Sequence, residues 1–392
     1  MASIRIKNIG PIKDTSDIPL THVMLIIGEQ STGKSTFLKI LCYCRWVEKK
    51  VMIGEYDDLL HFSVGDFIEP LKRFHKLSDQ YFENKDPMIH YQGDAIEIIY
   101  EKKRFSITKK AAFDEIRYNS KLSYIPAERN LLSAIPSLDA KYRSSTYDAM
   151  FNSVIEFGEA NEDFTSAHPL KLSFADNMEY YHEGFNDYVR LTDSKVKPLL
   201  LEHTSSGVQS ALPLNVMVHY LCSIAGSPAK RTPKAIIEDS SRGFGEAYIA
   251  NKLNWYNFPQ LFIEEPEQHL YPLSQAKLTR DIISQFKEAW KKTNQPGYVV
   301  ITSHSPYILT QLNVLLKASK AFVKDKGKTR EIVAEDCILP LEFFSSYFMA
   351  KNGKMVNMMD RQTKLIKGEY LDSVSEDTED VLNRLNDIIY GE

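Results

Sequence analysis

The sequence predicts an α/β fold organised around a mostly parallel sheet. Three stretches carry this prediction. Residues 23–27 are an apolar run that leads into a glycine loop and a helical pattern, residues 260–265 are an apolar run that ends in two glutamates, and residues 298–304 are an apolar run that ends in a histidine. Short apolar runs of this kind are typical of strands buried on both faces, and ligands bind at the strand ends of such sheets.

The first run opens a phosphate-binding loop. The motif is an intact G-x-x-x-x-G-K-S, formed by Gly28, Glu29, Gln30, Ser31, Thr32, Gly33, Lys34, Ser35 and Thr36. Gly28 and Gly33 permit backbone angles that curl amide N–H groups around phosphate oxygens. We expect Lys34 to reach the β- and γ-phosphates and Ser35 to hold magnesium, with the anion at the helix N-terminus.

The second run places Glu264 and Glu265 side by side at the tip of an apolar strand. Two ionised carboxylates in such a position need a cation or a polarised water to offset their desolvation. The pair therefore suits a magnesium ligand next to a general base.

Two further patches are ambiguous when taken alone. The stretch 204–210 opens a predicted helix at about 210–225 with small residues, including Ser206 and Gly207. It presents free amides and hydroxyls to an anion, or it is an ordinary serine-rich N-cap. A lone histidine such as His304 is more often a satisfied polar residue, but its place at the end of the next strand favours a functional role.

The remaining elements follow in chain order from their patterns. We expect strands at 4–9, 95–100, 104–107 and 122–126, helices at 57–82 and 140–177, a hairpin around 193–194, a helix at 274–292 and an amphipathic helix at 376–390. Alternating strands and helices around a phosphate loop indicate a mostly parallel sheet with a helical and β insertion between residues 45 and 200.

Composition narrows the function classes. The 392 residues carry a net charge of −4, so no overall basic field indicates nucleic acid or membrane. Basic clusters at 101–104, 109–110 and 317–330 are either solvated faces or DNA contacts. Four cysteines lack zinc spacing, and no run of 18 apolar residues occurs, so we expect reduced thiols and a cytoplasmic protein that does not cross a membrane.

These residues together resemble the ATP-binding-cassette class of P-loop ATPases, in the branch that contains OLD-family, RecF-like and SMC-like proteins. The resemblance implies an ABC-type core with a mostly parallel central sheet, an antiparallel β subdomain and a helical insertion. It makes Lys34 and Ser35 the Walker A residues, Glu264 the Walker B acid and second magnesium ligand, and Glu265 the glutamate that activates water. It makes His304 the histidine that senses the γ-phosphate. Residues 268–270 overlie the D-loop, and Glu128 stands where a Q-loop glutamine is expected.

Ser206 and Gly207 match the signature motif, which in this class binds ATP held by the other subunit. The resemblance therefore implies a homodimer, or a higher even oligomer, with shared ATP and Mg²⁺ sites. The core is expected at 1–44, 120–135 and 196–340. The insertion is expected at 45–119 and 136–195 as a partner or DNA surface, and a C-terminal extension at 341–392.

OLD nucleases continue into a Toprim domain with a D-x-D cluster, and no D-x-D follows Pro306 here. The chain thus resembles the stand-alone ATPases of two-gene anti-phage systems such as Septu and PARIS, in which a separate nuclease or toxin acts. The alternatives are a RecF-like DNA-repair or DNA-clamp ATPase, which would bind double-stranded DNA, and a transport ATPase subunit, which the Glu-Glu-Pro-Glu-Gln-His wording disfavours.

Overall fold

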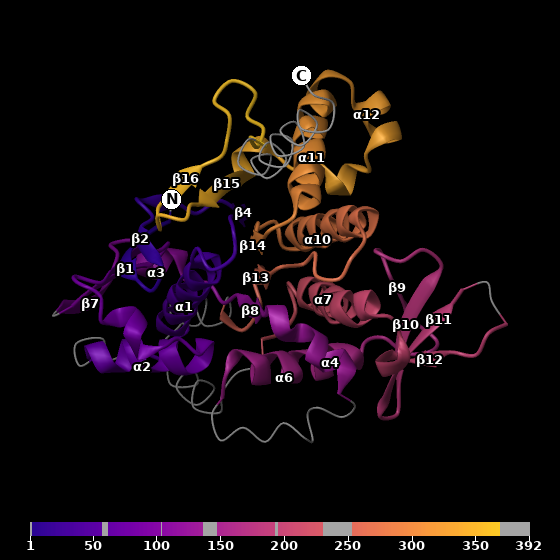
Figure 1. Ribbon diagram of the computed structural model, residues 1–392, viewed down its shortest axis with the longest axis horizontal. Coiled ribbons are helices and arrows are strands. Elements are labelled where there is room, and N and C mark those ends of the chain that lie inside the picture. The colour runs from indigo at the N-terminus through magenta and orange to yellow at the C-terminus, as the bar shows by residue number, and fades with distance from the viewer. Residues whose placement is uncertain are drawn as a thin grey trace, which may run out of the picture.

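A central six-stranded sheet organises the computed structural model, which describes residues 2–56, 62–102, 104–135, 147–192, 195–229 and 253–368 (Figure 1). Its strand order is β16 (Met355–Asn357), β15 (Phe344–Met349), β4 (Val23–Ile27), β14 (Tyr298–Ser303), β13 (Pro259–Glu264) and β8 (Lys121–Ile125). Neighbouring strands are parallel except for β16, which pairs antiparallel with β15 at one edge. The predicted α/β class with a mostly parallel sheet is confirmed.

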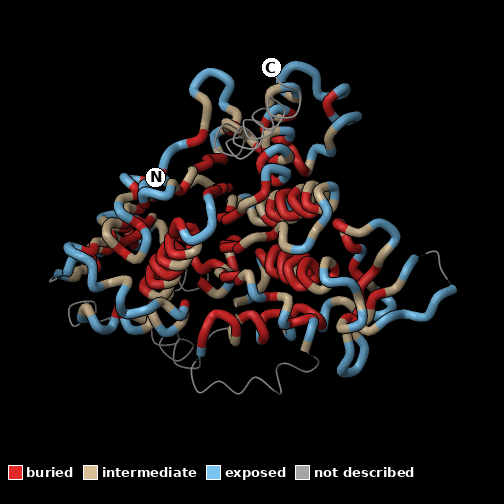
Figure 2. Tube along the Cα trace, in the orientation of Figure 1, coloured by how far each residue is buried: buried red, intermediate tan, exposed pale blue. Residues whose placement is uncertain are grey.

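Both faces of this sheet are buried, which explains why its strands are continuous apolar runs. Along β4, Val23 and Leu25 belong to one hydrophobic core while Met24 and Ile26 belong to the other. The first core is completed by α6 (Ala149–Asn161), α7 (Ser206–Ser223), α10 (Pro272–Thr293) and α11 (Pro306–Lys324), and the second by α1 (Lys34–Met52). Figure 2 shows the buried residues gathered on the central strands and on α1, α7 and α10.

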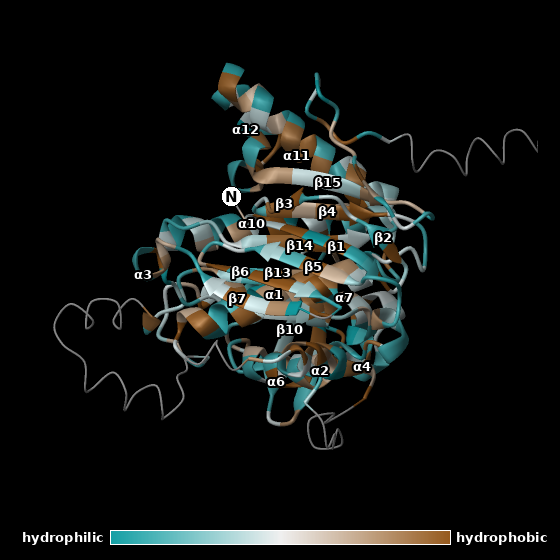
Figure 3. Cartoon of the chain, turned by 90° about the vertical axis from the view of Figure 1, so that its left-hand side faces the viewer, coloured by the Kyte–Doolittle hydropathy of each residue, from teal (hydrophilic) through white to brown (hydrophobic). Residues whose placement is uncertain are grey.

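A second, antiparallel sheet covers α1 from the other side. Its strands are β1 (Ser3–Ile9), β2 (Ile12–Asp14), β3 (Ile18–Pro19), β5 (Met88–Gln92), β6 (Ile96–Glu101) and β7 (Arg104–Lys109). Figure 3 views the molecule from the side of this sheet. Strand β5 pairs with β1 along its length, so residues 88–109 complete a sheet that the core's own first strand begins. This sheet thus joins β1 of the predicted core with β5, β6 and β7 of the predicted insertion at 45–119, because β1 offers an edge with which β5 pairs.

Arg45 fastens α1 to both sheets. Its guanidinium is fully buried and donates to Gln260 of β13 at 2.7 Å, to Asp94 at 2.8 Å and to Glu48 at 3.1 Å. The guanidinium also lies 4.3 Å from the centre of the Tyr298 ring. A buried guanidinium with carboxylate and amide partners avoids the cost of an unpaired charge, so this network fixes the angle between helix and sheets.

A third, small antiparallel sheet lies at the opposite end of the molecule in Figure 1. It contains β9 (Leu170–Lys171), β10 (Met178–Glu183), β11 (Asn186–Leu191) and β12 (Leu199–Leu200). The helix predicted at 140–177 is therefore wrong beyond α6, because the chain turns into this sheet. The helix predicted at 57–82 is shorter, with α2 at Val64–His75 and a 3-10 turn, η2, at Asp79–Phe82, while residues 57–61 lie outside the described part. The turn predicted at 193–194 also lies outside it.

The C-terminal part of the chain contributes to the core. Strand β15, which lies in the C-terminal extension predicted at 341–392, pairs in parallel with β4 of the predicted core. The predicted amphipathic helix at 376–390 lies outside the described residues. Where the structure describes the chain, no helix is both long and apolar enough to span a bilayer. All four cysteines are buried and free.

Candidate functional site

The loop after β4 has the geometry of a phosphate cradle. Gly33 adopts a left-handed φ of 110° directly before α1, and a Cβ on Gly28 would lie 2.4 Å from the Met349 carbonyl oxygen, so neither position accepts a side chain easily. The Lys34 ammonium donates to the Glu29 carbonyl at 2.6 Å, and the Thr32 hydroxyl donates to the same oxygen at 2.9 Å. These bonds fold the loop back over the start of the helix.

Lys34 is buried at the foot of this cradle. Burial lowers the pKa of its ammonium to about 8, although Glu265, Glu267 and Glu264 oppose the shift. A desolvated ammonium with carboxylates nearby and only a backbone partner is suited to neutralise an incoming phosphate.

The two acids at the end of β13 differ in burial and in hydrogen-bond partners. Glu264 is buried, and its Oε2 accepts a hydrogen bond from the Ala127 N–H at 3.3 Å. Glu265 is half-buried, with a left-handed φ of 42° that turns the chain sharply away from the strand. Its Oε1 lies 3.1 Å from His304 Nε2, and its Oε2 accepts from the Gln268 amide at 3.0 Å. The histidine contact, followed by that of Gln268, lowers the pKa of Glu265 to about 2.

One cleft of about 440 Å³ gathers most of the predicted site. Its described walls are Pro11, Gln30, Ser31, Gly33, Lys34, Ser35, Thr36, Tyr81, Glu265 and His304. Residues more than 260 positions apart in the chain thus face one space, and its volume is within the usual range for small-molecule sites, about 300–1,000 Å³. Gly28, Glu29, Thr32 and Glu264 shape the loop and the strand end behind it rather than the cleft surface.

The residues present fit a magnesium ion. Glu264 Oε1 is buried and has no hydrogen-bond partner in the part of the chain that the structure describes, so a carboxylate oxygen is left available. Mg²⁺ prefers a few oxygen ligands and completes its shell with substrate phosphates and water. Glu264 and the Ser35 hydroxyl would supply such ligands, and the ion would neutralise phosphate charge.

Two residues of the site escaped prediction. Arg129 lies in the 3-10 turn η3 (Ala127–Asn130) after β8 and is fully buried. Its guanidinium donates to the carbonyl oxygens of Glu264 at 2.6 Å, Glu265 at 2.7 Å and Ser210 at 3.1 Å. It therefore joins the carboxylate strand end to α7. Glu128, the neighbouring residue, is exposed. The sequence feature that could have indicated Arg129 is its position in the segment expected to hold the Q-loop.

Glu267 is the second missed residue. Its Oε1 accepts from the His304 backbone N–H at 2.6 Å and from the Ser303 hydroxyl at 2.9 Å, while burial raises its pKa. Glu267 therefore fixes the end of β14 and, with it, the position of His304. The sequence feature that could have indicated this role is that Glu267 is a third carboxylate, two positions after Glu265.

Ser206 and Gly207 lie at the start of α7, outside this cleft. Ser206 is exposed, and the Ser205 hydroxyl caps the helix by accepting from the Val208 N–H at 3.5 Å. A Cβ on Gly207 would lie 2.9 Å from the His269 carbonyl oxygen, so the helix start packs on the segment that follows the acids. The structure thus keeps this patch apart from the chain's own phosphate loop.

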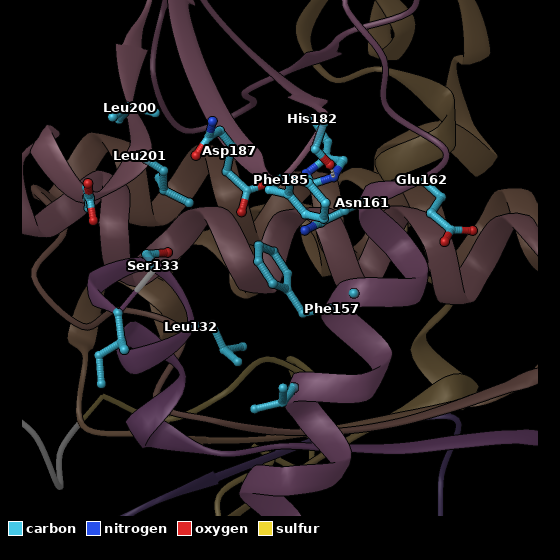
Figure 4. Close-up of a pocket in the computed structure, with 16 residues that line it drawn as sticks. Leu132, Ser133, Phe157, Asn161, Glu162, His182, Phe185, Asp187, Leu200 and Leu201 are labelled. Carbon is cyan, nitrogen blue, oxygen red and sulfur yellow. Dashed lines mark hydrogen bonds and ion pairs between the residues drawn. The ribbon is translucent and has the colours of Figure 1, made fainter. Parts of the chain in front are cut away.

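A separate cavity of about 230 Å³ lies between α6 and the β10–β11 hairpin (Figure 4). His182 Nδ1 lies 3.0 Å from Asp187 Oδ1, and the Tyr180 hydroxyl lies 2.6 Å from Asp187 and 2.7 Å from Asn161. These polar groups form hydrogen bonds with one another. We therefore assign them a structural role, which is to hold the hairpin against α6.

Comparison with solved structures finds likeness to SMC heads. The SMC head domain from Thermotoga maritima has 14% sequence identity and a TM-score of 0.36, covering 79% of this chain and 90% of that one. An Smc head domain with an extended coiled coil, bound to the C-terminal domain of ScpA and derived from Pyrococcus furiosus, has 11% identity and a TM-score of 0.35, covering 97% and 100%. No curated protein matches the chain.

The sequence itself matches one protein family. The match spans residues 23–310, from the strand before the phosphate loop into the helix after His304, and so includes every described wall of the cleft except Pro11. That range is well over half of the chain. The chain belongs to the family described as "AAA domain, putative AbiEii toxin, Type IV TA system".

Proposed function

We propose that this protein binds and hydrolyses ATP with Mg²⁺ in the cleft between the phosphate loop and the ends of β13 and β14. The observation that carries the proposal is the convergence of Lys34, Ser35, Glu265 and His304 on one space. An ammonium, a hydroxyl, an ionised carboxylate and an imidazole are the groups that phosphoryl transfer to water needs.

Each group has a distinct task in this proposal. The loop amides and Lys34 hold the phosphates, and Mg²⁺ on Ser35 and Glu264 would neutralise charge on them. Glu265 orients and deprotonates the attacking water, while His304 contacts the γ-phosphate. Tyr81 offers a flat ring at the cleft wall for the adenine base.

Closure of the site requires a second copy of the chain. Ser206 and Gly207 stand outside the chain's own cleft at the N-terminus of α7, which favours an anion. In a two-fold dimer each α7 start would cover the ATP of the other subunit. Hydrolysis would remove the γ-phosphate contact and loosen the pair, which makes the dimer a switch.

The biological role we propose is the ATPase subunit of a cytoplasmic anti-phage system that controls a separate nuclease or toxin. The family description names a putative toxin and a toxin–antitoxin system, which supports a place in a system of this kind, while the separate effector rests on the resemblance to stand-alone ATPases. A native pull-down with mass spectrometry tests it. A stoichiometric nuclease or toxin partner is expected, and a protein that purifies alone from its source cell would contradict the role.

A RecF-like DNA ATPase is the second candidate, because one surface is basic. Exposed Lys324, Lys326, Lys328 and Arg330 follow one another from the end of α11 into α12 (Lys326–Ile332). Basic side chains this close together favour contacts with the phosphates of a DNA backbone. ATPase activity that double-stranded DNA stimulates, and that charge reversal at Lys326 and Lys328 abolishes, would support this reading over the first.

Mixed variants test the shared ATP site. Lys34→Ala removes the phosphate contact and Ser206→Arg blocks the signature patch, so each protein alone should release little phosphate from ATP. Mixed together, they should form dimers with one intact site of two and recover up to about a quarter of the parent activity, since random pairing yields such dimers half the time. Absence of recovery at every ratio would contradict closure by the second copy.

A further inference from the structure

The second half of α1 lines a cavity that the ATP cleft does not include. The cavity has a volume of about 420 Å³ and is enclosed by α1, α2, β8, α6 and the segment before β13. Lys34 and Lys49 are 15 residues apart on α1, so a helix rise of 1.5 Å per residue separates the two sites by about 22 Å. The cavity is large enough for a small molecule of nucleotide size.

The lining of this cavity is cationic. Lys49, Lys50, Arg73 and Lys121 face a single carboxylate, Glu156. Lys121 is paired with Glu156 at 3.0 Å, and Lys50 is paired with Glu55. Lys49 is half-buried and Arg73 is exposed, and neither forms an ion pair with a carboxylate in the part of the chain that the structure describes. A lining with this excess of cations favours an anionic occupant.

Lys49 is the more enclosed of the two. Burial lowers the pKa of its ammonium to about 7, and Lys121 and Lys50 lower it further, while Glu55 and Glu156 oppose the shift. Its Nζ lies 5.6 Å from the centre of the Tyr256 ring. An anionic group bound beside this ammonium would stabilise its charged form.

The cavity also holds polar groups without partners. Both ring nitrogens of His75 and the Tyr43 hydroxyl are buried and make no hydrogen bond within the described residues. Burial holds the pKa of His75 well below its usual range, so its neutral ring can both donate and accept a hydrogen bond. Buried groups of this kind are normally satisfied, but these atoms lie behind the cavity surface, so a bound molecule would reach them only after side chains move.

Aromatic rings form the rest of the wall. Tyr43 and Trp46 are stacked with centres 5.7 Å apart, and Tyr147 lies beside Phe74 at 5.7 Å with half of its own surface exposed. Flat faces next to cations match a planar heteroaromatic ring that carries a negative group. From this combination we propose that the cavity is a binding site for a free nucleotide, with the base on the Trp46 and Tyr147 side and the phosphate at Lys49 and Arg73.

The test uses the full chain with Lys34→Ala, so that nucleotide binding in the ATP cleft is removed. Calorimetric titration with AMP, GMP, CMP and UMP, with the matching nucleosides and with inorganic phosphate, measures binding to the second cavity. We expect at least one monophosphate to bind once per chain with a Kd of about 1 mM or tighter, and its nucleoside and phosphate to bind at least about tenfold more weakly.

Lys49→Met and Arg73→Gln should each weaken that binding by about tenfold or more. Lys317→Met, which removes an exposed lysine on α11, is the matched control and should leave it unchanged. Because Lys49→Met replaces a desolvated ammonium with an apolar chain of the same length, the variant should melt at or above the parent temperature. Loss of binding in a fully folded variant thus reports the site rather than the fold.

Three results would overturn the proposal. One is that no monophosphate binds. Another is that binding is the same in Lys49→Met and Arg73→Gln as in the parent. The third is that inorganic phosphate binds as tightly as the best monophosphate, which would make the cavity an anion site without base recognition. None of these outcomes depends on whether the first cleft hydrolyses ATP.

Discussion

His304 Nε2 lies 3.1 Å from Glu265 Oε1, so the imidazole engages one oxygen of the carboxylate while the Gln268 amide engages the other. These contacts keep the pKa of Glu265 at about 2. A carboxylate with both oxygens engaged is a weak base, and proton transfer from water requires that one partner leaves. A histidine that turns from Glu265 to the γ-phosphate would release the base only when ATP is in place.

Replacement of this carboxylate tests its role. Glu265→Gln keeps the shape of the side chain but removes the base and replaces one acceptor oxygen with an N–H donor, so kcat for ATP should fall by about 10²- to 10⁴-fold. ATP-bound dimers should then accumulate, which size-exclusion chromatography with ATP and Mg²⁺ measures. Glu288→Gln, on the exposed face of α10, is the control and should turn over normally. Unchanged turnover in Glu265→Gln would exclude it as the base.

The pH dependence of ATP binding tests Lys34. Its pKa is lowered to about 8 and bound phosphate should raise it, so the charged form binds ATP and binding takes up a proton near that pH. Affinity should be constant below about pH 7 and fall by up to about tenfold per unit above about pH 8. Titrations across this range measure it. Lys34→Arg, which stays charged, should show a flat profile, and a flat profile in the parent would contradict the prediction.

Arg129 should be a major contributor to stability. Arg129→Met leaves the buried carbonyl oxygens of Glu264, Glu265 and Ser210 without their donor, so the free energy of unfolding should fall by about 2–4 kcal/mol. Urea unfolding measures this change. Arg330→Met breaks only an exposed ion pair with Glu335 and should cost less than about 1 kcal/mol. Equal losses in the two variants would show that the buried arginine does not hold the strand end.

Gly28 should tolerate no side chain. A Cβ there would lie 2.4 Å from the Met349 backbone oxygen, so Gly28→Ala must displace β15 from β4 and should destabilise the protein by about 1–3 kcal/mol. Gly158→Ala is the matched control, because a Cβ at that position of α6 meets nothing within 4 Å. Thermal melting should show the control to be more stable by about 0.5–1 kcal/mol. A neutral Gly28→Ala would mean that β15 is mobile relative to the loop.

Most of the residues that line the candidate cleft were predictable because they lie in short local motifs. The strand, loop and helix from residue 23 to residue 41 are contiguous, and the acids and His304 stand at the ends of apolar runs that only buried parallel strands explain. Arg129 was not predictable in its role. Its partners are backbone carbonyls at positions 210, 264 and 265, and no sequence pattern marks a carbonyl that a distant side chain will reach.

The sheet to which each strand belongs was not predictable, for a related reason. The β5 and β15 segments read as ordinary strands, but only hydrogen bonding to β1 and β4 assigns them to the sheets of the core. Strand pairing across long loops depends on which edges remain free, and this is settled by the whole fold.

By itself, therefore, the sequence determined the chemistry at each strand end: a phosphate loop at Gly28 to Thr36, paired acids at Glu264 and Glu265, and a histidine at 304. The tertiary structure decided which of these side chains share a space and which do not. It placed His304 beside Glu265, left Ser206 outside the walls of its own cleft, and gathered Lys49 and Arg73 in a second cavity. A short sequence motif indicates which chemistry its residues can perform, whereas contacts between distant segments form only when the whole chain packs.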